Sequence, residues 1–188
     1  MKKKLFLFVM LAIPVSIFSQ HIAVKNNIVY DAMLTPNLGV EIGLNKNLTL
    51  DIIGNYNPFE LDNKTMWKHW LVQPELRYWF CERFSRAFIG IHAHAGHANV
   101  GDVKLPFDLY HRLSGVRNEG DFYGGGLSLG YQLPLAKRWN LELSVGGGYA
   151  YIQYDKFDLE TDEKIKSKLV HNYWGLTKAT ISVIYIIK

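Results

Sequence analysis

Apolar and polar residues alternate with a period of two along most of this chain. In residues 38–44 every even position is apolar, whereas the odd positions are two glycines and Glu41. Successive side chains of a β-strand point to opposite faces, so this pattern predicts strands that each have one apolar face. No segment keeps the spacing of an amphipathic helix for long. The predicted strands are residues 23–34, 38–44, 48–53, 70–80, 87–96, 126–133, 141–151 and 178–187, of which the first alternates least cleanly.

The connections between these segments alternate in length. The predicted short turns are residues 45–47, 81–85 and 135–138, and the long polar connections are residues 58–68, 97–120 and 155–174. Only the first connection, residues 35–37, is short where a long one is expected. Short turns at one rim and long loops at the other are typical of bacterial outer-membrane barrels. The sequence therefore predicts an all-β fold, an eight-stranded antiparallel transmembrane β-barrel.

The first residues read as a separate unit. Lys2, Lys3 and Lys4 precede an apolar stretch over residues 5–18, and Ser19 follows it. These are the features of a secretory signal peptide, and the stretch is shorter than the roughly 20 apolar residues that a membrane-spanning helix needs. We expect residues 1–19 to be a signal peptide and residues 20–188 to form a barrel domain in the cell outer membrane.

Charge and composition exclude some classes of function. The chain has 21 Lys and Arg against 17 Asp and Glu, and the signal peptide holds three of the 21, which leaves 18. A mature chain this close to neutral, without a basic run, argues against nucleic acid as a partner. Cys81 is the single cysteine, which excludes a disulfide framework.

The composition of the two faces indicates which of them is in contact with lipid. The polar face consists mostly of Gly, Ser, Thr, Gln and Asn with isolated charges, which suits a narrow lumen better than a surface exposed to water. Aromatic residues of the apolar face lie near strand ends, as in the two aromatic girdles of a membrane barrel. A secreted lipocalin-like barrel with an apolar interior is the alternative. Pro74 falls inside a strand and predicts a bulge there.

Charged residues of the polar face are the candidates for a network in the lumen. Buried charges must pair, so we expect a salt-bridged plug rather than a catalytic pair of carboxylates. Its expected members are Lys25, Asp31, Glu41, Asp51, Glu75, Arg77, Glu142 and Lys178.

Three histidines are weak candidates for a metal site. His92 and His94 share a face because they are two residues apart, and His97 follows shortly beyond. The more economical interpretation is that His92 and His94 form hydrogen bonds inside a polar lumen. No phosphate-binding loop, nucleophile elbow or His-Glu-x-x-His motif occurs, and the sequence predicts no cofactor.

Several segments resemble a known family. Residues 35–44, 68–79, 81–84, 137–142 and 154–156 are similar to those of an uncharacterised family of outer-membrane β-barrels from Bacteroides-type bacteria, catalogued as a domain of unknown function. The resemblance covers most of the mature chain. It implies an outer-membrane barrel without an established activity or cofactor, and the proximity of some members to fimbrial genes implies a role in anchoring or displaying surface structures.

The function that we expect is therefore non-enzymatic: a barrel whose extracellular loops bind a partner, such as a surface or fimbrial protein. Loops on a rigid scaffold commonly carry binding residues. The candidates here are the aromatic and cationic residues Phe107, Tyr110, Arg112 and Arg117. The alternatives are an outer-membrane enzyme acting on lipid A and the lipocalin-like barrel. The sequence leaves the partner, the oligomeric state and conduction through the lumen open.

Overall fold

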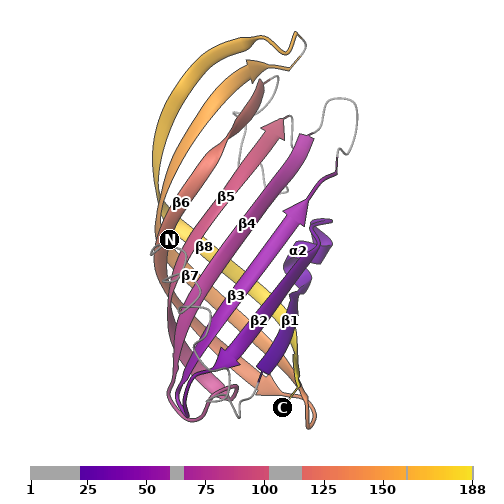
Figure 1. Cartoon of the computed structure of the whole chain (residues 1–188), viewed down its shortest axis with the longest axis vertical. Coiled ribbons are helices and arrows are strands. Elements are labelled where there is room, and N and C mark those ends of the chain that lie inside the picture. Colours follow the sequence, from indigo (N-terminus) through magenta and orange to yellow (C-terminus); the bar gives the residue numbers. More distant parts are fainter. Residues whose placement is uncertain (1–21, 60–65, 102–115, 160, 188) are drawn as a thin grey trace, which may run out of the picture.

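The computed structural model describes residues 22–59, 66–101, 116–159 and 161–187. Over these ranges the chain forms a closed antiparallel barrel of eight strands in which β8 returns to pair with β1 (Figure 1). The elements are β1 (Ile22–Asn27), α2 (Ile28–Ala32), β2 (Asn37–Gly43), β3 (Leu48–Asn57), β4 (Met66–Trp79), β5 (Arg86–Gly101), β6 (Val116–Pro134), β7 (Trp139–Asp158) and β8 (Lys164–Ile186). The predicted all-β antiparallel barrel is confirmed. Within the described ranges no helix has the length and apolar character needed to cross a bilayer.

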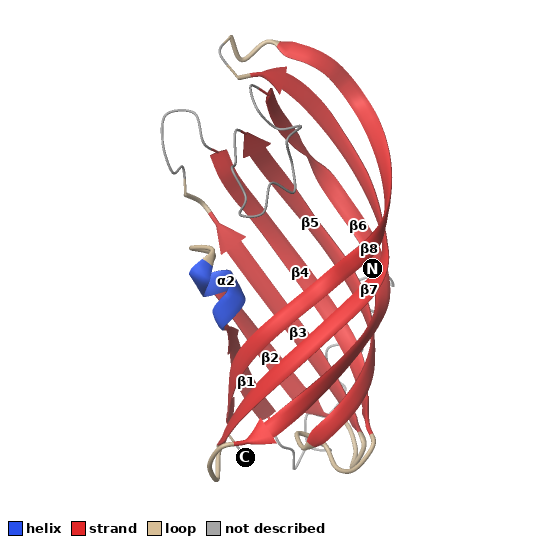
Figure 2. Ribbon diagram, turned by 180° about the vertical axis from the view of Figure 1, so that it is seen from behind, coloured by secondary structure: helices blue, strands red, loops and turns tan. Residues whose placement is uncertain are grey.

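The strands differ greatly in length, from 6 residues in β1 to 23 in β8. β7 and β8 therefore rise well beyond β1, β2 and β3 and curve over at their far ends (Figure 2). The prediction of a long loop over residues 155–174 was wrong, because β7 continues to Asp158 and β8 begins at Lys164. Each face of this hairpin mixes apolar and polar residues, so apolar alternation did not mark it. Pairing between β7 and β8 supplies its backbone hydrogen bonds.

The first strand is shorter than the predicted residues 23–34. β1 ends at Asn27, whose side chain accepts a hydrogen bond from the N–H of Val29 and caps α2. The Asn37 side chain also bonds the backbone of Asn27, accepting from its N–H at 2.7 Å and donating to its carbonyl at 3.0 Å. The side-chain amide of Asn37 thus satisfies the backbone N–H and C=O of Asn27 in place of a neighbouring strand, and β1 ends there.

Pro74 lies in β4 without the predicted bulge. β4 pairs with β5 in one register on both sides of the proline, Val72 with Ala95 and Glu75 with His92. No extra residue is inserted between them. The missing N–H of Pro74 coincides instead with a local gap in the pairing, at Gln73 and Pro74.

The two faces of the wall have opposite character. Outward-facing residues are apolar and exposed, as with Ile91 and Leu127, each at 60 %. Inward-facing residues are mostly polar or charged and buried, with a few apolar ones such as Ile53 and Ala150. At the short-turn end Trp79, Phe84 and Phe88 close the interior. This arrangement is the inverse of a lipocalin, whose apolar face points inward.

Glycines in the wall make room for the large interior side chains. A Cβ at Gly130 would lie 2.2 Å from the ring of Phe88, which Trp79 holds on one side at a centroid distance of 4.7 Å. Gly130→Ala is therefore expected to lower the free energy of unfolding by about 1–3 kcal/mol through overpacking. Gly54→Ala is the control, because its nearest neighbour would lie at 3.9 Å. Denaturant titration in lipid vesicles measures both; equal stabilities would show that Phe88 can move.

Candidate functional site

A buried charge network fills the middle of the barrel. Its side chains come from the walls β1, β2, β3, β4, β7 and β8, and each is at most 6 % exposed. Alternation directs them inward, and closure of the barrel brings together groups up to 153 positions apart, between Lys25 and Lys178. The members are Lys25, Glu41, Asp51, Glu75, Arg77, Glu142 and Lys178.

Arg77 is the centre of this network. Its Nη1 and Nη2 bind the two carboxylate oxygens of Glu142 at 2.8 and 3.0 Å, which is a bidentate pair. The same guanidinium contacts Glu41 at 2.9 Å, Asp51 at 2.6 Å and Glu75 at 2.8 Å. One planar cation thus holds carboxylates from four strands.

Lys25 and Lys178 supply the other two cations of the network. Lys25 Nζ lies 2.6 Å from Glu41 and 3.2 Å from both Asp51 and Glu142, while Lys178 binds Glu75. Neutral groups satisfy further oxygens: Thr49 donates to Glu41 at 2.6 Å, Gln132 donates to Glu142 at 2.9 Å, and Ser128 donates to Glu75. Such dense pairing compensates for the loss of water around each charge.

The composition of the network favours a structural plug. Four carboxylates face three cations, and within the described part of the chain Asp51 Oδ1 is the one carboxylate oxygen of this cluster that is buried without a hydrogen-bond partner. Every other acid is bound by a cation and by a hydroxyl, an amide or a second cation. Carboxylates held in this way bind the wall of the barrel together and have little freedom to exchange protons with a substrate.

Asp31 is the one expected member of this network that lies elsewhere. It belongs to α2 and is exposed, and its carboxylate accepts hydrogen bonds from Asn37 at 2.9 Å and Asn26 at 3.3 Å. The prediction for Asp31 was wrong because it assumed that β1 continues to Leu34. A helix turns this carboxylate away from the lumen.

The three histidines do not form one group. His92 and His94 point inward, are 3 % and 6 % exposed, and have ring centroids 5.9 Å apart; His92 Nε2 lies 2.9 Å from the Thr177 hydroxyl. His97 points outward, with Nδ1 2.8 Å from Asp121. Among the described residues no three His, Cys, Asp or Glu side chains are placed to hold a metal ion.

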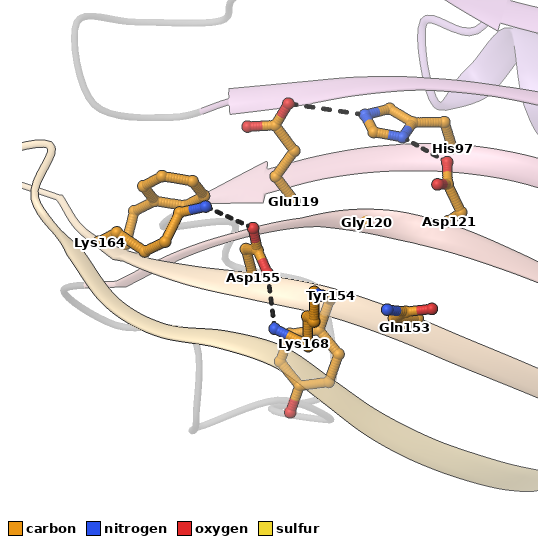
Figure 3. Close-up of a pocket in the computed structure, with 10 residues that line it drawn as sticks. His97, Glu119, Gly120, Asp121, Gln153, Tyr154, Asp155, Lys164 and Lys168 are labelled. Atoms are coloured by element: carbon orange, nitrogen blue, oxygen red, sulfur yellow. Dashed lines mark hydrogen bonds and ion pairs between the residues drawn. The ribbon is translucent and has the colours of Figure 1, made fainter.

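A pocket of about 480 Å³ lies on the outward face where β5 to β8 extend past the shorter strands (Figure 3). His97 of β5 contacts Asp121 and, at 3.8 Å, Glu119 of β6. On its other side Asp155 of β7 binds Lys164 of β8 at 2.7 Å and accepts from the backbone N–H of Lys168 at 2.7 Å. The lining also includes Gln153, Tyr154 and Phe157.

Arg117 lies beside this pocket and is the described member of the predicted binding set. Its guanidinium lies over the ring of Phe157 at 4.2 Å and binds Glu119 at 2.9 Å and Asp162 at 2.7 Å. Phe107, Tyr110 and Arg112 lie outside the described residues. Sequence reasoning missed Phe157, Lys164 and Lys168 because it assigned them to a loop. Gln153, Asp155 and Phe157 do not alternate in polarity with Tyr154 and Lys156, so no sequence pattern marked them as one strand face.

Asp155 makes the far end of the hairpin sensitive to pH. The hydrogen bond from Lys164, and after it the N–H of Lys168, lower the pKa of this exposed carboxyl below its ordinary 3.8. The ionised carboxylate of Asp155 therefore stabilises the hairpin at pH values above its ordinary pKa of 3.8. This stabilisation is lost as the pH falls through the lowered pKa of the folded protein. We expect the NMR signal of the Lys168 amide to shift in that acidic range.

Asp155→Asn is the matched control for this prediction. It keeps an oxygen that can accept from Lys168 and removes the titration, so the shift of the Lys168 amide should disappear. An unchanged acidic shift in Asp155→Asn would assign it to another carboxylate.

Comparison with known proteins gives one family. Residues 5–187 match DUF3575, described as a protein of unknown function. Neither the curated proteins nor the solved structures contain a match.

Proposed function

The chain belongs to the DUF3575 family of proteins of unknown function, and from its geometry we propose that it is a non-enzymatic outer-membrane barrel that presents its extended rim to a partner. The observation that carries the proposal is the outer surface. It combines an apolar band, bordered by aromatic residues at both ends, with a charged pocket beyond one border.

The aromatic borders have the spacing of a bilayer. Trp70 and Tyr78 on β4 are eight residues apart, and so are Tyr123 and Tyr131 on β6, and all four are exposed outward. Eight residues extend roughly 27 Å along a strand, or about 21 Å along the barrel axis at a tilt of ~40°, close to the ~25 Å apolar band of outer-membrane barrels. The upper border continues on β7 and β8 with Tyr149 and Trp174, whose rings lie 4.9 Å apart.

The interior supports a scaffold rather than a pore. Eight strands enclose a space that side chains fill, and here Arg77, Lys25 and their carboxylates fill it from wall to wall. The aromatic cluster around Trp79 and Phe88 closes the short-turn end. These two layers argue against passage of solutes through the barrel.

The extended rim is the part available to a partner. β7 continues seven residues beyond Tyr151 to Asp158, and the hairpin returns through β8 at Lys164. In the proposed orientation the short turns face the periplasm and the extended rim lies outside the cell. This rim includes Arg117 and the pocket between His97 and Lys168. A surface or fimbrial protein is the kind of partner that the family resemblance suggests.

Labelling of single cysteines on intact cells tests the orientation. Cys81 is exposed and lies at the short-turn rim, so a membrane-impermeant maleimide should label the wild-type protein only after the cells are permeabilised. Asp162→Cys in a Cys81→Ser background should react on intact cells. If the maleimide labels the wild-type protein and the Asp162→Cys variant equally on intact cells, the outer-membrane orientation is contradicted.

Complementation of a gene deletion tests the site of function. Arg117→Ala with Phe157→Ala removes the cation–π pair beside the pocket and should abolish complementation while the protein still folds and inserts. His92→Ala with His94→Ala should retain it. If the histidine variant folds but fails to complement, the function belongs to the lumen and the rim proposal is wrong.

A further inference from the structure

The upper part of β8 has one unpaired edge. β8 pairs with β7 from Tyr185 to Lys164, but its other edge pairs with β1 only from Ile186 to Ser182. The last link on that side is the N–H of Ile181, which donates to Asn27 Oδ1 at 3.2 Å. Among the described strands none pairs with this edge between Lys164 and Thr180. The carbonyls of Leu176 and Thr177 accept hydrogen bonds from the side chains of Tyr173 and Gln73 at 3.3 and 3.4 Å. The remaining backbone N–H and C=O groups of the edge are a template for another strand.

Part of this edge is regular and lacks the usual protection. Residues 169–176 keep one register with β7, between the irregularity at Lys168 and the bulge at Thr177. They contain no Asp, Glu, Lys, Arg or Pro, although proteins commonly place lysine or proline on edges to prevent pairing. The outward side chains Val170, Trp174 and Leu176 are 50 %, 77 % and 59 % exposed.

Charge at the end of this edge indicates what it binds. Lys164, Lys166 and Lys168 follow one another along β8 toward the tip of the hairpin, and Lys166 and Lys168 are exposed. Residues 164–176 of a second copy contain no carboxylate and would offer these ammonium groups no ion-pair partner, whereas a partner segment with carboxylates would complement them.

We propose that residues 169–176 of β8 bind an extended acidic segment of a partner protein by strand addition. Backbone hydrogen bonds along the free edge hold the segment, and Val170 and Trp174 pack against its outward side chains. Lys166 and Lys168 pair with carboxylates at one of its ends, while Lys164 stays with Asp155. The inference rests on the proposed function in one respect: residues 169–173 must lie outside the membrane, with Trp174 and Leu176 at the aromatic border.

A synthetic peptide tests the proposal on the full chain in lipid vesicles. The probe alternates valine and threonine and carries three glutamates at one end; the controls replace glutamate by lysine or methylate alternate backbone nitrogens. The glutamate peptide should bind and slow amide exchange at alternate positions of residues 169–176 by at least about tenfold. The methylated peptide should not protect them.

Two variants and one control distinguish peptide binding at this edge from non-specific binding to the barrel. Val170→Lys with Trp174→Lys should abolish binding, and Lys166→Glu with Lys168→Glu should transfer the preference to the lysine peptide. Trp139→Lys, at an exposed tryptophan of the opposite rim, should bind as the parent does.

Three results would overturn the proposal: absence of binding at millimolar peptide, equal binding of the methylated peptide, or protection of residues 169–176 without peptide that grows with protein concentration, which would mean a second copy on the edge. Vesicle insertion is scored separately. A chain that inserts but leaves the peptide unbound contradicts only the strand-addition proposal, whereas a chain that does not insert contradicts the proposed function.

Discussion

Replacing Arg77 by methionine is expected to lower the free energy of unfolding by about 3–5 kcal/mol. The guanidinium contacts Glu41, Asp51, Glu75 and Glu142, and it is fully buried. Methionine fills a similar volume but leaves four buried carboxylates with two lysines. Denaturant titration of the barrel in lipid vesicles measures the change.

Two comparisons identify the cause of this loss. Arg138→Met, at an exposed turn, should change stability by less than about 0.5 kcal/mol. Adding Glu142→Gln to Arg77→Met should restore part of the loss, because it removes one of the unpaired charges. If Arg77→Met costs no more than Arg138→Met, the network contributes little to stability and its carboxylates become candidates for another role.

Leu76→Lys is expected to lower the free energy of unfolding in lipid by about 1–2 kcal/mol, because the cost of a lysine grows with its depth, from about 0–1 kcal/mol near an interface to roughly 2–4 kcal/mol at the midplane. Leu76 is 42 % exposed on the outward face of β4, six residues below Trp70 and two above Tyr78. It thus lies within the proposed apolar band, where an ammonium group loses its water without gaining a partner.

Leu135→Lys is the matched control, because Leu135 is 64 % exposed in a short turn outside the band. Both variants are titrated with denaturant in vesicles. Equal, small effects for Leu76→Lys and Leu135→Lys would show that the outward face is in water and would remove the basis for a membrane location.

The sequence predicted the barrel well where one face is apolar and the other polar. The strand over residues 70–80 and the observed β4 agree in their faces, since burial of one face fixes which side each residue takes. The prediction failed where that contrast is lost. Residues 155–158 and 164–174 mix apolar and polar side chains on both faces, and their strand structure depends on pairing between β7 and β8 rather than on burial.

The charge network could be anticipated because inward positions of a narrow barrel leave few places for charges. The partners of each residue could not, because they depend on the register around the closed ring: Lys25 meets Glu142 across the β1 and β8 junction. The rim pocket was inaccessible to sequence reasoning for a related reason. His97, Asp121 and Asp155 come together through the register of β5, β6 and β7, which local patterns do not specify.

Pairing of the first strand with the last makes the folding of this chain an all-or-none event. Until β8 is in place, β1 has an open edge, and Lys25, Arg77 and Glu142 stand in an incomplete wall with water among them. Contacts that join the two ends of a chain must overcome a large loop-closure entropy, so barrels of this kind fold slowly. A chain shortened before residue 178 lacks both the closing strand and Lys178, one of the two cations that bind Glu75. It is expected to remain an open sheet exposed to aggregation.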